Sequence, residues 1–154
     1  MTPAETGRIE KRIVIRAPRS RVWRAITDAA EFSRWFGVKM EGAFQPGAAV
    51  RLTSTHPGYE GIAFSVTIDR MEPERLFSWR WHPGVPQENI DYSKEPATLV
   101  EFRLDDVEGG TMVTVAESGF ERISLARRAA LIKENEGGWE YQVKSLEGYV
   151  SQTP

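Results

Sequence analysis

Residues 62–81 read IAFSVTIDRMEPERLFSWRW, and this stretch decides the fold class. Over residues 62–71, large apolar residues alternate with small or polar ones, which is the period of a strand that buries one face. Over residues 77–81 an aromatic residue recurs at every second position, and Pro73 lies between the two runs, where the chain must turn. The stretch therefore predicts two adjacent antiparallel strands with a shared apolar face.

The same alternation recurs on both sides of this pair of strands. It covers residues 8–16, 98–104 and 111–117, and turns rich in glycine and proline separate further strand-like runs between residues 38 and 61. Short turns connect antiparallel neighbours, and a sheet of that kind commonly has one face on the core and one in water. The chain is therefore predicted to build an antiparallel sheet with one apolar face.

Two short helices are predicted between the first strand and the rest of the sheet. Pro18 suits the first turn of a helix, and apolar residues at helical spacing follow it as far as Ile26. Asp28 is a candidate N-cap for a second helix, which Gly37 would end. The second helix would present three aromatic residues to one side, Phe32, Trp35 and Phe36.

Beyond Gly119 the pattern is helical to the end of the chain. Ser124 is a candidate N-cap, and the pair Gly137-Gly138 could interrupt the helix. The last stretch carries a narrow apolar stripe made of Trp139, Val143, Leu146 and Val150. This stripe needs an apolar partner, and the one-sided sheet is the natural one. The predicted fold is therefore α+β, with the long C-terminal helix packed on the sheet.

Length and composition indicate one globular domain. We expect it to span residues 1–154, with a flexible tail over residues 1–7. The hydrophobic fraction of 40% and the charged fraction of 27% are typical of globular proteins. The sequence has neither an apolar run long enough to span a bilayer nor a basic and then apolar N-terminal signal. We therefore expect a cytoplasmic protein with no membrane partner.

Cysteine content and charge exclude several classes of function. The chain has no cysteine, which excludes disulfides, thiolate metal sites and cysteine nucleophiles. The net charge of −2 argues against a nucleic-acid partner, because gripping phosphates usually needs a concentrated basic field. His56 and His82 lie in proline-flanked loops without metal-ligand spacing, so we expect no metal and no cofactor.

Glu117 is the ionisable residue with the most informative position. It shares strand parity with Val113 and Val115, which places it on the apolar face. An ionised carboxylate there needs a partner, and a buried carboxylate often has a task. Alternatively, Glu117 is a strand-end residue that reaches solvent or pairs with an arginine, although Arg51 and Arg80 are expected to point outward. In a ligand carrier, leucine at this position should leave the fold at least as stable.

Four segments together carry a resemblance to a known family. They are residues 15–37 (IRAPRSRVWRAITDAAEFSRWFG), 72–81 (EPERLFSWRW), 110–120 (GTMVTVAESGF) and 137–140 (GGWE). In these segments the chain resembles the SRPBCC, or START-like, superfamily, and within it the homologues of the activator of the heat-shock-protein-90 ATPase. The resemblance implies a helix-grip fold, in which a curved seven-stranded antiparallel sheet wraps around the last helix. It also implies a cavity that in many relatives receives a hydrophobic ligand.

The resemblance and the sequence pattern together predict a site. The aromatic residues of the strands and the last helix either line such a cavity or simply form the core. The predicted ligand-contacting residues are Phe77, Trp79, Trp81, Glu117, Trp139 and Val143. Glu117 and His82 are candidate proton-transfer groups. The leading hypothesis is a carrier or sensor of a small hydrophobic molecule, and the alternatives are a cyclase-like or hydratase-like enzyme and a chaperone-binding module. Both a monomer and a homodimer fit the sequence.

Overall fold

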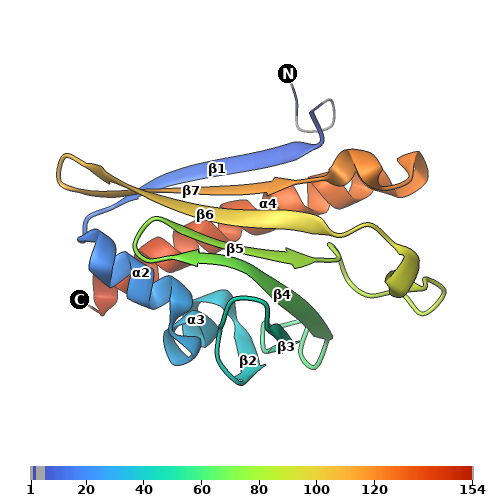
Figure 1. Cartoon of the computed structure of the whole chain (residues 1–154), viewed down its shortest axis with the longest axis horizontal. Coiled ribbons are helices and arrows are strands. Elements are labelled where there is room, and N and C mark those ends of the chain that lie inside the picture. The colour runs from blue at the N-terminus through green and yellow to red at the C-terminus, as the bar shows by residue number, and fades with distance from the viewer. Residues whose placement is uncertain (1, 3–5, 154) are drawn as a thin grey trace.

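The structure is a computed structural model that describes residue 2 and residues 6–153. Figure 1 shows the order of the elements along the chain. They are β1 (Arg8–Ile15), α2 (Arg19–Thr27), α3 (Ala29–Phe36), β2 (Val38–Glu41), β3 (Ala49–Ser54), β4 (Ala63–Glu72), β5 (Leu76–Trp81), η1 (Tyr92–Lys94), β6 (Thr98–Val107), β7 (Gly110–Ser118), η2 (Phe120–Arg122) and α4 (Leu125–Gln152). Within the described residues, no helix is both long enough and apolar enough to cross a bilayer.

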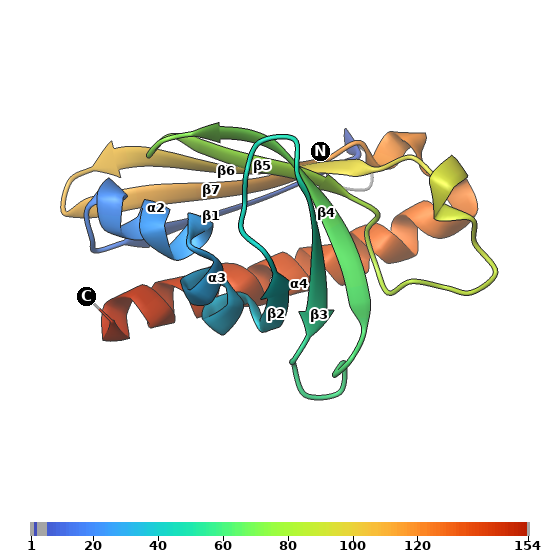
Figure 2. The same cartoon turned by 60° about the horizontal axis from the view of Figure 1, so that its bottom comes forward.

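The seven strands form one sheet in the order β1-β7-β6-β5-β4-β3-β2, and every neighbouring pair is antiparallel. The sheet curves, and α4 runs along its concave side, while α2 and α3 close one end (Figures 1 and 2). In Figure 2 the strands β2, β3 and β4 bend around α4. The predicted helix-grip fold, with two short helices after the first strand, is confirmed.

The apolar stripe of α4 supplies one half of the core. Trp139, Val143, Leu146 and Val150 are all buried, as the spacing predicts. Side chains at alternate positions of β5, β6 and β7 supply the other half, among them Phe77, Phe102 and Val115, each at most 1% exposed. The alternation in the strands and the stripe in the helix therefore meet in a single core.

The caps of α3 agree with the sequence. A side-chain oxygen of Asp28 accepts a hydrogen bond from the backbone N–H of Glu31 at 3.0 Å, which is the usual N-cap interaction. Gly37 ends α3 with φ of 79°, a left-handed conformation that glycine adopts without strain. Ser124 stands at the N-cap position of α4, but its side chain makes no capping hydrogen bond. Ser124 therefore marks the start of α4, as predicted, but its side chain does not cap the helix.

The helix α4 continues through Gly137 and Gly138, so the predicted interruption is wrong. Two helical glycines cost about 1 kcal/mol each relative to alanine. Buried residues on both sides of the pair, Ile132 and Trp139, fix the helix on the sheet, and this packing outweighs the poor propensity. No atom lies within 4 Å of the position that a Cβ would take at either glycine. Close packing therefore does not require glycine at these two positions.

The strand bounds differ slightly from those predicted. β4 begins at Ala63, and β6 continues to Val107 because it pairs with β7 as far as Gly110. Before β1, the carbonyl of Gly7 accepts a hydrogen bond from the backbone N–H of Phe120 at 3.3 Å. Most of the tail predicted over residues 1–7 falls on residues 1 and 3–5, which lie outside the described residues. The tail and the single-domain assignment stay predictions.

Candidate functional site: a cavity beside the C-terminal helix

A cavity of about 420 Å³ lies between α4 and the ends of strands β2 to β5. This volume falls in the range of small-molecule sites, and apolar and aromatic side chains make up most of the wall. The lining residues are Phe36, Gly37, Val38, Ser54, His56, Tyr59, Ile62, Phe64, Trp81, His82, Gly84, Val85, Pro86, Glu134, Asn135, Gly138, Trp139, Tyr141 and Gln142.

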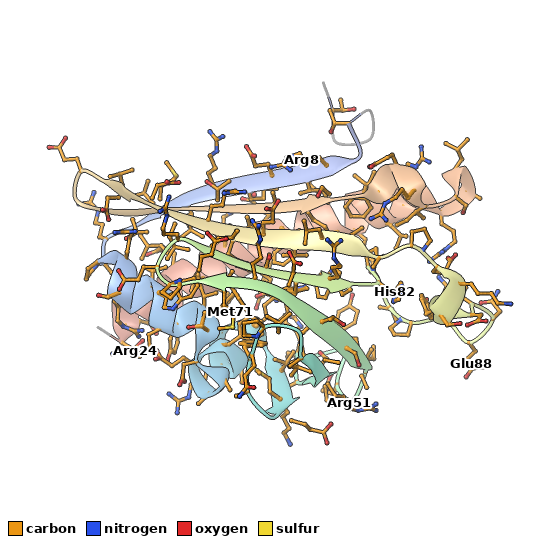
Figure 3. All side chains as sticks on the ribbon, viewed as in Figure 1. Arg8, Arg24, Arg51, Met71, His82 and Glu88 are labelled. Atoms are coloured by element: carbon orange, nitrogen blue, oxygen red, sulfur yellow. The ribbon has the colours of Figure 1, made fainter. Side chains whose placement is uncertain are left out.

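Three of the residues predicted from the sequence line this cavity: Trp81, His82 and Trp139. Trp81 ends β5, and Trp139 faces it from α4, with 5.9 Å between the ring centroids. Figure 3 shows His82 where β5 runs into the following loop, which carries Glu88. The structure therefore brings the end of the aromatic strand and the middle of α4 together, as the sequence predicts.

The other predicted aromatic residues, Phe77 and Trp79, lie in the core and do not line the cavity. Trp79 has no exposed surface and packs against Phe102 with 5.3 Å between the ring centroids. Val143 is buried on α4, one turn beyond Trp139, and is also absent from the cavity wall. A direct ligand contact for these residues stays a prediction, and the structure places them as supports behind the wall.

Glu117 has no exposed surface, and its two carboxylate oxygens accept four hydrogen bonds. One oxygen accepts from Trp81 Nε1 at 2.9 Å and from the Thr98 hydroxyl at 2.5 Å. The other accepts from Asn135 Nδ2 at 2.9 Å and from Trp139 Nε1 at 2.8 Å. Four donors satisfy the four lone-pair sites of an ionised carboxylate. Glu117 therefore neither reaches solvent nor pairs with an arginine, and that alternative is wrong.

The expected outward direction of the two arginines is confirmed. Arg80 is exposed, and Arg51 pairs at 3.7 Å with Glu41 on the neighbouring strand. Figure 3 shows Arg51 at the β2–β3 side of the sheet. Among the described residues no cation pairs with Glu117, because its partners are neutral N–H and O–H groups that belong to the sheet and to α4.

The hydrogen bonds of Glu117 join β5 and β6 to α4 beneath the cavity. They fix the indole rings of Trp81 and Trp139, both of which line the cavity, so Glu117 acts as a positioning residue for the wall. Hydrogen bonds to an ionised acceptor are stronger than those between neutral groups. Leucine at this position would leave four donors without an acceptor. The structure therefore reverses the expectation that a leucine variant would be at least as stable.

The two histidines face the cavity from different elements. His82 Nε2 lies 3.0 Å from the carbonyl oxygen of Glu95, and His56 Nδ1 lies 3.1 Å from the carbonyl oxygen of Pro57. A carbonyl only accepts, so these two nitrogens carry the hydrogens, and in the neutral rings the other nitrogens are acceptors. The His56 ring also meets the Tyr141 ring edge to face, with 5.2 Å between the centroids.

The described residues contain no group of three or more His, Asp or Glu side chains arranged to hold a metal ion. His56 and His82 belong to the wall of the cavity, and each makes a hydrogen bond to a backbone carbonyl.

Comparison with known proteins identifies the family. Residues 16–151 match the family described as activator of Hsp90 ATPase homolog 1-like protein. The chain belongs to this family. The predicted resemblance is thus confirmed over nearly the whole sequence. No curated protein is detectably similar to this chain.

Several solved structures share the fold of this protein. A protein of Arthrobacter aurescens has a TM-score of 0.79 at 16% identity, over 99% of this chain and 90% of that chain. A protein of Mesorhizobium loti has a TM-score of 0.76 at 20% identity, over 96% and 98% of the two chains. An Aha1 dimer from Colwellia psychrerythraea has a TM-score of 0.70 at 19% identity, over 93% and 95%. At these identities the similarity establishes the fold alone.

Sequence reasoning missed most of the cavity wall, since three of its 19 lining residues were predicted as site residues. His56 and Tyr59 lie in the turn between β3 and β4, where no periodicity marks a direction. Tyr141 and Gln142 lie on α4 but off its apolar stripe, so the helical pattern gives them no inward position. Tyr59 and Tyr141 are both exposed, and neither belongs to an apolar face that the sequence pattern could have identified.

Proposed function

We propose that this protein binds a small hydrophobic molecule in the cavity beside α4 and acts as its carrier or sensor. The observation that carries the proposal is the wall itself, to which six aromatic side chains contribute: Phe36, Tyr59, Phe64, Trp81, Trp139 and Tyr141. Family membership supports it, because this fold family commonly binds hydrophobic ligands. A smaller cavity of about 230 Å³ shares Phe64 and His82 with the first and would extend the space available to a ligand.

The cost of keeping this space open also supports a ligand. Apolar side chains that line an open cavity stay in contact with water and forgo the free energy that burial in the core would provide. A ligand that buries about 200 Å² of its own apolar surface there would gain roughly 5 kcal/mol before the cost of immobilisation. Glu117 holds two walls in place, and Gly138 adds no side chain to the space. Both features favour an open cavity over a collapsed one.

Two alternatives have a specific observation behind them. A cyclase-like or hydratase-like enzyme needs a proton-transfer group in contact with the ligand, and His82 lines the cavity whereas Glu117 has no exposed surface. A chaperone-binding role is the second alternative, and the family description supports it. The dimeric relative from Colwellia psychrerythraea supports a homodimer as the oligomeric state. The cytoplasmic location predicted from the sequence stays a prediction.

Filling the cavity from Gly138 tests the proposal. A leucine at Gly138 enters open space, because no atom lies within 4 Å of the new Cβ. The neutral apolar dye N-phenyl-1-naphthylamine should bind the wild-type protein, and its affinity should fall at least about tenfold in Gly138→Leu, since leucine occupies the dye's space. Gly137→Leu is the matched control, because Gly137 precedes it on the same helix and does not line the cavity.

Native mass spectrometry of the purified wild-type protein complements the titration, because a co-purified apolar molecule would reveal the natural ligand class. The proposal fails if the dye binds none of the three proteins, or if it binds Gly138→Leu as tightly as it binds Gly137→Leu.

A further inference from the structure

The charged side chains in the wall of the cavity are acidic and not basic. Among the described residues that line it, there is no lysine and no arginine, and the acidic residue Glu134 is exposed at its edge. Behind the wall lies Glu117, whose partners are neutral and leave its charge uncompensated. A charge in a medium of low dielectric acts over a longer distance than one in water. The charges of the cavity wall and of the residue directly behind it are therefore both negative.

Most of the side-chain N–H donors of the wall already have an acceptor, and the amide groups of Asn135 and Gln142 each keep one further N–H. Trp81, Trp139 and Asn135 all donate to Glu117, and the side-chain nitrogen of Gln142 donates to the carbonyl of Phe36 at 3.0 Å. An anionic ligand would need such donors to replace its hydration shell. The remaining side-chain donors of the wall are hydroxyl groups and the second N–H of each amide, and these neutral donors bind an anion more weakly than an arginine or lysine would.

Acceptors, in contrast, are in excess. The neutral rings of His56 and His82 each keep one acceptor nitrogen, because their other nitrogen donates to a backbone carbonyl. The side-chain oxygen of Gln142 is buried and has no hydrogen-bond partner, so its partial negative charge is not neutralised. The aromatic faces of the wall add to this, since their π systems attract cations.

We infer that the molecule bound in this cavity is an organic cation, with an apolar body and a protonated amine, and that the cavity disfavours carboxylates. The inference rests on the proposed function and names its ligand class. The apolar body replaces water against the aromatic wall, and the ammonium group interacts with the π faces and with the acceptors near His56, His82 and Glu134.

Three ligands that differ only in the head group test the inference. Decylamine, decan-1-ol and decanoate share one alkyl chain, and at pH 8 a primary amine is cationic and a fatty acid is anionic. Titration calorimetry and tryptophan fluorescence of the intact protein should show decylamine binding about tenfold tighter than decan-1-ol, with decanoate weakest. Added salt should weaken the decylamine preference.

A matched pair of variants locates the source of the preference. Glu134→Gln removes a charge that lines the cavity, and Glu136→Gln removes a charge on the same helix that does not. We expect the ratio of decylamine to decan-1-ol affinities to fall about threefold in Glu134→Gln and to stay unchanged in Glu136→Gln.

The possible failures are distinguishable. Decan-1-ol binding as tightly as decylamine, or decanoate binding most tightly, would overturn the cationic ligand class and leave the hydrophobic site standing. Binding of none of the three ligands would count against the proposed function itself. An equal loss of preference in Glu134→Gln and Glu136→Gln would show that long-range net charge, and not the cavity, selects the cation.

Discussion

Two glutamates tie α4 to the rest of the molecule, one near each end of the core. Glu117 is fully buried and Glu31 is partly buried, and they have different partners. Glu31 on α3 pairs with Arg21 at 2.9 Å and with Arg24 at 2.8 Å, and it accepts a hydrogen bond from the Tyr149 hydroxyl at 2.9 Å. Glu117 on β7 has four neutral donors and no cation. The charge is neutralised at the C-terminal end of α4 and left uncompensated beside the cavity.

The packing around the two glutamates also differs, because only Glu117 lies beside a cavity. Around Glu31 the packing is closed, and α4 is tied to α3 by a hydrogen bond from the Ser145 hydroxyl to the Trp35 carbonyl at 2.6 Å. Beside Glu117 the wall stays open, and Gly138 contributes no side chain to it. The region around Glu31 therefore holds α4 in place by neutralised charges and packing. The region around Glu117 combines an open cavity with an uncompensated charge, which is the arrangement that the proposed ligand site needs.

Glu117→Leu should have the largest effect of the substitutions that probe this comparison. It leaves the Trp81, Thr98, Asn135 and Trp139 donors without their acceptor, and we expect a loss of about 4 kcal/mol in the free energy of unfolding. Urea denaturation measures it. Glu117→Gln keeps the shape but turns an NH₂ group toward two donors, so its expected loss is smaller, about 2 kcal/mol. A leucine variant as stable as the wild type would mean that the four hydrogen bonds contribute nothing.

Glu31→Gln comes next and also depends on pH. Burial raises the pKa of Glu31, but the hydrogen bonds from Tyr149, Arg21 and Arg24 and the charge of Arg21 together lower it below its ordinary value of 4.5. A lowered pKa contributes stability that is present above the unfolded pKa and is lost as the pH falls through the folded pKa. We expect Glu31→Gln to lose about 2 kcal/mol at pH 7.

The same difference, measured by urea denaturation at a series of pH values, should begin to shrink below about pH 4.5, the ordinary pKa of the carboxyl, and should be lost as the pH falls through the lowered pKa of Glu31 in the folded protein. A difference that stays constant down to pH 3 would show that packing, and not the charge of Glu31, holds this end of α4.

Replacing helical glycines should have the smallest effect and should sharpen the comparison along α4. Gly137 lies beside the cavity and Gly148 near the closed end, and no atom lies within 4 Å of a Cβ at either position. Alanine at each should raise the free energy of unfolding by about 1 kcal/mol, because alanine loses less backbone entropy than glycine. A gain at Gly148 without a gain at Gly137 would show that α4 bends or opens beside the cavity.

Strand parity predicted which face of the sheet each side chain occupies, but not whether a side chain on that face lies in the core or lines the cavity. Trp79 and Trp81 share a face of β5, yet Trp79 is covered by Phe36 and Phe102, and Trp81 reaches the cavity because it ends the strand. Parity alone gives both residues the same environment. The depth of a side chain depends on where the neighbouring elements end, which a pattern of period two does not encode.

Parity likewise placed Glu117 inward but did not identify its partners. Thr98 follows from the register of β6 on β7 only once the pairing is known, and Asn135 requires the rotation of α4 over the sheet. Asn135 lies one turn before Trp139 on the same face of α4, but it is polar, so a pattern of apolar residues did not include it. Periodicity therefore predicted the individual strands and helices well, but it could not predict side-chain contacts between elements that are distant in sequence.

The indole N–H signals of the five tryptophans offer the most direct test of the cavity as the binding site. Trp81 and Trp139 line the cavity and donate to Glu117, whereas Trp35 donates to the carbonyl of Ala25 at 2.7 Å near the closed end. In ¹⁵N–¹H spectra recorded while N-phenyl-1-naphthylamine is added, the signals of Trp81 and Trp139 should shift and that of Trp35 should not. Shifts at Trp35 with unchanged Trp81 and Trp139 signals, or no shifts at all, would contradict binding in this cavity.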